Sequence, residues 1–265
     1  MQIIQQNLND HAYLKGYVQT PDPAGSYKTL PAMIILPGGA YKKIPIEQTE
    51  ALATAFAGKG FQSFYLRYSL VSEKKPLMPQ PLIELAQAVR FLRQNAAQFN
   101  LNPQQIAILG VSVGGHIAAL YNDYFHQPDF AKLTGLTLAD IKINAAMMGY
   151  PVISPQLGFP TDEAALATWT SNPEKLAADK LVRSANAPSF VWTTTTDNVV
   201  PAINATSYVM ALQKQHVSVE YHLYPEGPHG LALANPLTGA DQQTILPHVA
   251  TWFNLAIQWL NKQFH

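Results

Sequence analysis

One serine in this sequence has neighbours suited to nucleophilic chemistry. Ser112 stands at the centre of Gly110-Val111-Ser112-Val113-Gly114, which fits the pattern Gly-x-Ser-x-Gly. This pattern is typical of a sharp turn between a strand and a helix, because larger side chains two residues from the serine would collide across the turn. The apolar residues 106–109 predict the strand, and residues 116–125 predict the helix. We expect the Ser112 hydroxyl to attack an acyl carbon; a glycine-rich turn that only packs a helix on a strand is the alternative.

A second glycine-containing loop could supply the hydrogen-bond donors that such an attack requires. Residues 32–36 predict a central strand, and Pro-Gly-Gly-Ala-Tyr follows at 37–41. Backbone N–H groups stabilise the negative oxygen of a tetrahedral intermediate. Gly39 and Ala40 are small enough for a substrate oxygen to approach their amides, and the amide of Val113 at the helix start is a further donor. A plain turn is the alternative interpretation.

The general base for this chemistry is expected to be a histidine on a loop late in the chain. Of the eight histidines, His229 alone lies on a loop directly after a predicted strand, and the glycines near it permit a tight bend. His116 comes one turn after Ser112, but its side chain should point away from the serine, so we expect it to pack or to hydrogen-bond. The other histidines are interpreted as terminal, surface, helix-start or strand residues: His11, His126, His216, His222, His248 and His265.

The acid that orients this base is expected between the serine and the histidine in the chain. Asp197 follows the predicted strand 189–196 and precedes residues 198–201, where a helix should begin. This places Asp197 at the carboxyl edge of a parallel strand, where sites in open α/β sheets form. Its alternative role is to cap that helix or to lie in a turn. Three other aspartates are interpreted as helix-start or surface charges: Asp162, Asp179 and Asp241.

The elements that must position these residues alternate along the chain. Expected strands span 2–8, 13–19, 32–36, 61–68, 106–109, 143–150, 189–196 and 217–224. Expected helices span 46–59, 82–99, 116–125, 201–215 and 247–264. Asn102-Pro103 is a helix-start or turn signal. The alternation predicts an α/β fold with a mostly parallel central sheet and helices on both faces.

A long segment, residues 151–188, connects two of the predicted strands. Ser171-Asn172-Pro173-Glu174 has the spacing of a capping box, so we expect short helices within the segment. With Phe159, Trp169 and several prolines, it could form a cap beside the site or an ordinary crossover, and the sequence leaves both open. In either case residues 1–265 are expected to form a single domain.

The composition excludes several classes of function. The chain has 265 residues, 48% of them hydrophobic, and its 17 basic residues balance 17 acidic ones. This balance gives no reason to expect nucleic acid or a membrane as a partner. Cysteine is absent, which rules out a cysteine nucleophile, a thiolate metal site and disulfides. The start of the chain lacks the pattern of a signal peptide, and we expect a soluble, cytoplasmic protein.

Four segments in order, PGGAY, GVSVGGH, TTDNVVP and EGPHG, resemble those of the α/β-hydrolase family of small carboxylesterases. The resemblance is greatest to the acetyl esterase branch with its acetylxylan-esterase-like enzymes, and it runs from about residue 31 to 260. It implies a nucleophile at Ser112, an acid at Asp197 and a base at His229. Oxyanion amides are implied at Gly39, Ala40 and Val113.

The sequence departs from the related hormone-sensitive-lipase-like enzymes at two motifs. Those enzymes carry His-Gly-Gly-Gly where this chain has Pro37-Gly38-Gly39-Ala40, and Gly-Asp-Ser-Ala-Gly around the serine. The missing histidine leaves the first loop to be held by other contacts. Neither departure removes a catalytic group.

The expected function is that of a serine carboxylesterase acting on short, mainly acetyl, esters through an acyl-enzyme, without metal or organic cofactor. Tyr41 and Trp169 are predicted to line the substrate pocket. One alternative is a peptidase similar to the catalytic domain of prolyl-oligopeptidase-type enzymes, and another is a catalytically idle binding protein. The expected partner is a small-molecule ester, which could carry a sugar or a xylan fragment as its alcohol. Sheet edges or helices could pair copies of the chain into a homo-oligomer, and nothing marks which.

Overall fold

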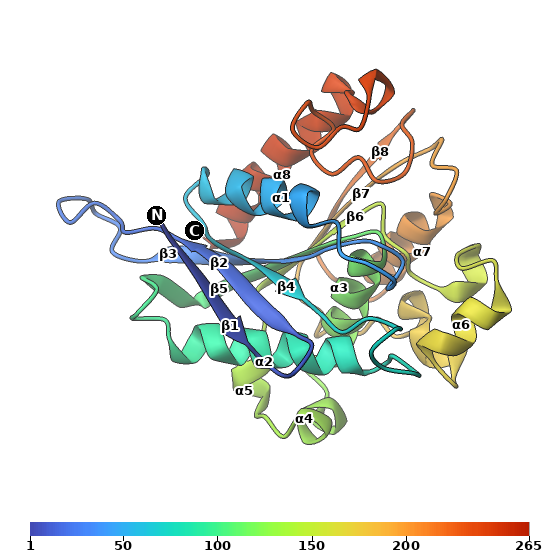
Figure 1. Cartoon of the computed structure of the whole chain (residues 1–265), viewed down its shortest axis with the longest axis horizontal. Helices are drawn as coiled ribbons and strands as arrows, with labels where there is room; N and C mark the ends of the chain where they lie inside the picture. The colour runs from blue at the N-terminus through green and yellow to red at the C-terminus, as the bar shows by residue number, and fades with distance from the viewer. Residues whose placement is uncertain (265) are drawn as a thin grey trace.

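The chain folds around one eight-stranded sheet in a computed structural model that describes residues 1–264 (Figure 1). His265 lies outside the described residues. The strands are β1 (Gln2–Asn7), β2 (Tyr13–Val18), β3 (Leu30–Leu36), β4 (Gln62–Arg67), β5 (Leu101–Val111), β6 (Ala145–Gly149), β7 (Ser189–Thr194) and β8 (Val219–Tyr224). Their order across the sheet is β1-β2-β4-β3-β5-β6-β7-β8. The pairs that involve β1 or β2 are antiparallel, and the others are parallel.

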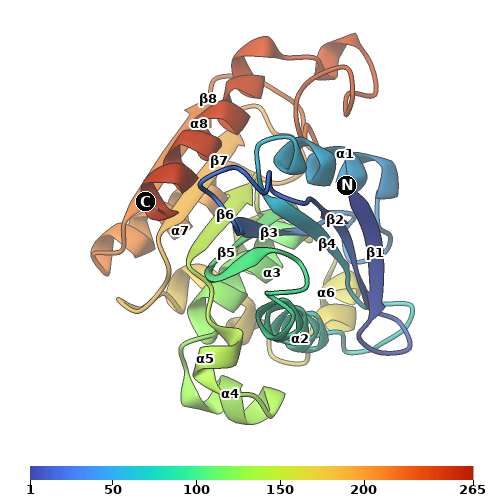
Figure 2. The ribbon, with the colours of Figure 1, turned by 90° about the vertical axis from the view of Figure 1, so that its left-hand side faces the viewer.

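Helices cover both faces of the sheet because its central strands are apolar on both sides. Helices α1 (Ile46–Ala57) and α8 (Pro247–Phe264) pack on one face, where Met33 and Leu109 belong to their core. Helices α2 (Gln80–Gln94), α3 (Val113–Tyr124) and α7 (Ile203–Lys214) pack on the other, where Ile34 and Ile108 point. Figures 1 and 2 show the two layers from different sides. This arrangement confirms the predicted α/β fold with a mostly parallel sheet.

The structure differs from the prediction in the middle of the chain. Helix α2 ends at Gln94 rather than at residue 99, and Asn102-Pro103 lies inside β5 rather than at a turn or helix start. Pairing of β3 with β5 shifts register between Leu30 and Ala32, so the strand continues through this irregular stretch. Two further helices were not expected: α4 (Pro128–Thr134) and α5 (Leu138–Ile141).

Residues 151–188 contain only short helices, as the sequence predicted. They are η1 (Pro155–Leu157), α6 (Glu163–Trp169), η2 (Pro173–Leu176) and η3 (Ala178–Lys180), and a further short helix, η4 (Gln242–Thr244), precedes α8. The predicted capping box at Ser171 is wrong, because Asn172 precedes η2 and makes no side-chain cap there. Two other side chains cap helices in this segment, Ser154 at the start of η1 and Asp162 at the start of α6. Among residues 1–264, every helix is too short or too polar to span a membrane.

Candidate active site

Ser112 lies at a strained turn between β5 and α3. Its backbone angles are φ 57° and ψ −123°, a conformation that non-glycine residues rarely adopt. A Cβ atom on Gly110 would overlap the carbonyl group of Gly114, and one on Gly114 would overlap the carbonyl oxygen of Leu36 on β3. Glycine at both places therefore permits the sharp turn and brings α3 against the sheet.

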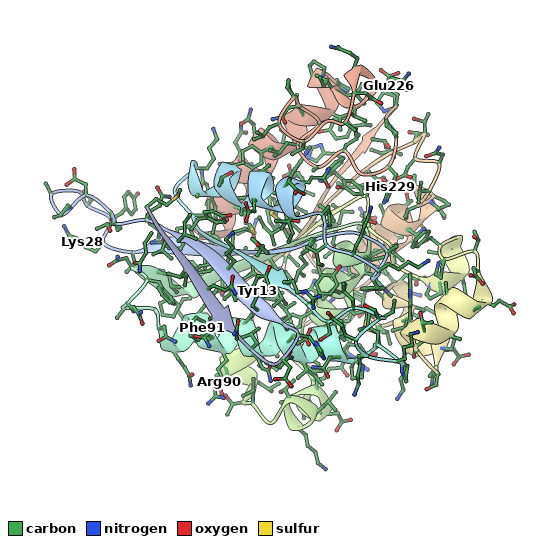
Figure 3. The ribbon with its side chains drawn as sticks, in the orientation of Figure 1. Tyr13, Lys28, Arg90, Phe91, Glu226 and His229 are labelled. Carbon is green, nitrogen blue, oxygen red and sulfur yellow. The ribbon has the colours of Figure 1, made fainter. Side chains whose placement is uncertain are left out.

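The structure brings the three predicted triad residues together from separate loops. The Oγ atom of Ser112 lies 2.8 Å from Nε2 of His229, and Nδ1 of His229 lies 2.7 Å from Oδ2 of Asp197. Ser112 is 8% exposed, and the His229 side chain is 15% exposed. Figure 3 shows His229 at the end of the molecule where α6 also lies. A carboxylate that accepts from Nδ1 leaves Nε2 able to take the proton of a serine hydroxyl.

Backbone amides fix the carboxylate of Asp197. Its Oδ1 atom accepts hydrogen bonds of 2.9 Å from the amides of Val199 and of Val200, and its side chain has no exposed surface. Helix α7 begins at Ile203 after Ala202, so Asp197 forms a turn and does not cap that helix. The amides hold one oxygen while the other faces His229, which sets the direction of the carboxylate.

Two threonines hold the loop that carries His229 against the loop that carries Asp197. The amide of Gly227 donates to Oγ1 of Thr196 at 2.8 Å, and Oγ1 of Thr194 donates to the carbonyl oxygen of Gly227 at 2.7 Å. Gly227 has φ 142°, and a Cβ atom added there would collide with the side chains of Leu231 and Thr194. Sequence reasoning missed these threonines, although their position directly before Asp197 was a usable signal.

Tyr150 supports His229 through a ring contact and a hydrogen bond to the same loop. The two rings meet edge to face, with centroids 5.0 Å apart and planes at 78°. The Tyr150 hydroxyl accepts a hydrogen bond of 3.1 Å from the amide of Ala232, three residues after the histidine. Sequence reasoning also missed this tyrosine, because nothing in the chain order links the end of β6 to the loop after β8.

The predicted oxyanion loop lies beside Ser112. A Cβ atom added to Gly38 would lie 3.1 Å from Cβ of Ser112. Within residues 1–264 the amides of Gly39 and Ala40 donate to no other protein group, so they are available to a substrate oxygen. This chain has Pro37 where hormone-sensitive-lipase-like enzymes carry a histidine, and the hydroxyl of Tyr68 donates to the carbonyl oxygen of Pro37 at 2.7 Å, which holds the loop.

Two residues predicted to line the pocket are instead buried inside the protein. Tyr41 has no exposed surface and Trp169 is 2% exposed, and their rings pack edge to face with centroids 4.8 Å apart. No substrate can touch either side chain in this conformation, so the geometry assigns them to the support of the site. His116 is fully buried and hydrogen-bonded, as predicted. Val113 is also buried.

Comparison with known proteins decides the family. The sequence profile of the BD-FAE family matches residues 20–153, about half of the chain. The chain belongs to the BD-FAE family. This BD-FAE chain is also similar in structure to the carboxylesterase Cest-2923 from Lactobacillus plantarum WCFS1. The two are 33% identical with a TM-score of 0.94, and the alignment covers 99% of this chain and 98% of that one.

The BD-FAE chain is also similar in sequence to two longer curated proteins. Endo-1,4-beta-xylanase B of Butyrivibrio fibrisolvens is 30% identical over 77% of this chain and 33% of its own length. The acetylxylan esterase of Xylanibacter ruminicola is 23% identical over 83% of this chain and 45% of its own length. The chain thus spans about a third to a half of the curated relatives it matches. The predicted resemblance to the α/β-hydrolase family of carboxylesterases is confirmed.

Proposed function

We propose that this chain is a serine esterase that hydrolyses short-chain, mainly acetyl, esters. The observation that carries the proposal is the continuous hydrogen-bonded chain from Ser112 through His229 to Asp197, with distances of 2.8 and 2.7 Å. Such a chain is the arrangement that activates a serine hydroxyl. Its intact geometry argues against the idle binding protein that the sequence left open.

The proposed mechanism has two half-reactions. In the first, Oγ of Ser112 forms a bond to the acyl carbon while Nε2 of His229 takes the hydroxyl proton; the alcohol then leaves with that proton. In the second, His229 takes a proton from water as the oxygen of water attacks the acyl carbon; the bond from that carbon to Oγ then breaks, the carboxylic acid leaves, and the proton returns to Oγ of Ser112. The amides of Gly39, Ala40 and Val113 stabilise the negative oxygen in both tetrahedral intermediates.

The low exposure of Ser112 supports a small acyl group. Ser112 is 8% exposed, and a Cβ atom added to the neighbouring Gly38 would lie 3.1 Å from its Cβ. A confined nucleophile disfavours long acyl chains, which need an apolar channel. For the alcohol we propose a sugar or a xylan fragment, supported by a relative named acetylxylan esterase. The small-molecule ester as a partner and the cytoplasmic location are parts of the same proposal.

The proposal is tested by hydrolysis of p-nitrophenyl acetate, butyrate and octanoate and of an aminoacyl anilide. Wild-type protein should cleave the acetate fastest, and Ser112→Ala should lower kcat/KM by at least about 10³-fold. The control is Ser154→Ala, a second buried serine outside the triad, which should keep the wild-type rate. Equal, slow rates in wild type and Ser112→Ala would contradict the mechanism, and preference for the anilide would favour the peptidase alternative.

A further inference from the structure

The loop after β3 is held in a conformation that its residues do not favour by themselves. Gly39, Ala40 and Tyr41 have φ angles of 109°, 56° and 60°. Alanine and tyrosine disfavour this left-handed region, so contacts elsewhere must hold them there. The proposed mechanism uses the amides of Gly39 and Ala40 but gives no task to the buried groups behind them.

Tyr41 joins this loop to the first turn of α3. Its side chain is fully buried, and its hydroxyl lies 3.1 Å from Nδ1 of His116 and 3.2 Å from the carbonyl oxygen of Val113. Val113 also carries the proposed donor amide on the α3 side. One tyrosine therefore contacts both halves of the proposed oxyanion hole, the half after β3 and the half at the start of α3.

The surroundings of His116 fix the direction of its hydrogen bond with Tyr41. Nε2 of His116 lies 2.8 Å from the carbonyl oxygen of Leu176, and a carbonyl can only accept, so Nε2 carries the hydrogen. Burial lowers the pKa of His116 to about 4, which leaves the ring neutral at pH 7 with a lone pair on Nδ1. Nδ1 of His116 and the carbonyl oxygen of Val113 can then only accept, so the single hydroxyl hydrogen of Tyr41 is shared between them.

Residues 151–188 complete the support. Leu176 accepts the hydrogen bond of His116, and Trp169 packs edge to face on Tyr41 with ring centroids 4.8 Å apart at 89°. The segment thus contacts Tyr41 directly through Trp169 and, through Leu176, contacts His116, the hydrogen-bond partner of Tyr41. Both Tyr41 and His116 are enclosed and cannot touch a substrate in this arrangement.

We propose that Tyr41 and His116 are positioning residues, which set the separation between the amides of Gly39 and Ala40 and the amide of Val113. The inference rests on the proposed function, since it concerns the oxyanion hole of that reaction. An oxyanion forms only as the acyl carbon is attacked, so a changed separation should slow turnover while substrate binding stays the same.

The test compares Tyr41→Phe, His116→Gln and the double variant with wild type. Phenylalanine keeps the ring and removes the donor, while glutamine keeps a donor for Leu176 and lacks the acceptor at Nδ1. Titration with a fluorophosphonate counts the active molecules, so that kcat for p-nitrophenyl acetate refers to folded, reactive protein. Each single variant should lose about tenfold or more in kcat with KM changed less than about twofold, and the double variant should lose no more than the worse single one.

A boronic acid inhibitor gives a second readout, because it forms a tetrahedral adduct on the serine. Its inhibition constant should rise by the same factor as kcat/KM falls, which a merely structural role would not produce. The matched control is Tyr121→Phe on α3, another buried tyrosine, whose hydroxyl donates to the carbonyl oxygen of Ile141 at 2.7 Å. It should keep the wild-type kcat.

Two results would overturn the proposal. One is a kcat per active molecule within twofold of wild type in both single variants. The other is a double variant whose loss is the product of the single losses, because independent effects multiply. Failure of the proposed function looks different: wild-type protein itself would then lack hydrolysis that depends on Ser112, whatever the variants do.

Discussion

Asp197 divides its two carboxylate oxygens between separate tasks. Oδ1 accepts the amides of Val199 and Val200, and Oδ2 faces Nδ1 of His229 at 2.7 Å. The backbone therefore sets the direction of the carboxylate, and the carboxylate sets the tautomer of the imidazole. The acceptor at Oδ2 is therefore decisive for the proposed role of Asp197.

Replacing Asp197 by asparagine should slow the enzyme severely without unfolding it. The amide can still accept from Val199 and Val200, but its NH₂ group would face Nδ1 and favour the tautomer whose Nε2 carries the hydrogen. We expect kcat for p-nitrophenyl acetate to fall by about 10³- to 10⁴-fold. Asp162→Asn, at the exposed start of α6, should keep the wild-type kcat. A loss of less than tenfold in Asp197→Asn would contradict the proposed role.

His116 should make stability depend on pH below neutrality. Burial lowers its pKa from 6.5 to about 4 in the folded protein, so between these values the unfolded chain binds a proton that the folded chain does not. The free energy of unfolding should fall as pH drops from about 6.5 to 4, by up to about 3 kcal/mol from this group. The free energy of unfolding, measured in urea at pH 7 and at pH 4, should differ less between the two pH values in His116→Gln than in wild type. An equal change in both proteins would contradict this prediction.

At the scale of the element, β5, its turn and α3 act as one unit. Gly110 and Gly114 let the turn close, and Gly114 also lets α3 approach β3 at Leu36. The sequence predicted this unit because its pattern is local: an apolar strand, two glycines around a serine, and a helix. Local patterns also misled the prediction for Asn102-Pro103. This pair is a turn signal by itself, but it lies in β5 because that strand pairs with β3, which is distant in the chain.

Gly114→Ala should disrupt this unit. The added methyl group would overlap the carbonyl oxygen of Leu36, so β3 or α3 must shift. We expect the free energy of unfolding to fall by about 2–3 kcal/mol and most esterase activity to be lost. The control Gly58→Ala lies at the end of α1 with φ −63° and ordinary contacts, and it should stay within about 1 kcal/mol of wild type. Wild-type stability and activity in Gly114→Ala would contradict the tight packing described.

At the scale of the whole molecule, the site is assembled from the ends of four strands. The loops after β3, β5, β7 and β8 contribute the amides, Ser112, Asp197 and His229 in turn. Chain order and loop position were enough to predict these groups. They were not enough to predict the role of Tyr150 or the burial of Tyr41 and Trp169, because these depend on which distant segments come into contact. Tyr41 and Trp169 pack together although they lie 128 positions apart in the chain, and only the folded structure shows this contact.

Ser112 is the nucleophile of the proposed mechanism, and covalent labelling can identify the reactive serine. Wild-type protein would be treated with a fluorophosphonate at pH 7, digested, and examined by peptide mass spectrometry. We predict one phosphonyl group per chain, on the peptide at Ser112, with hydrolysis of p-nitrophenyl acetate lost in proportion to labelling. Labelling elsewhere, or full activity in protein labelled at Ser112, would contradict the account.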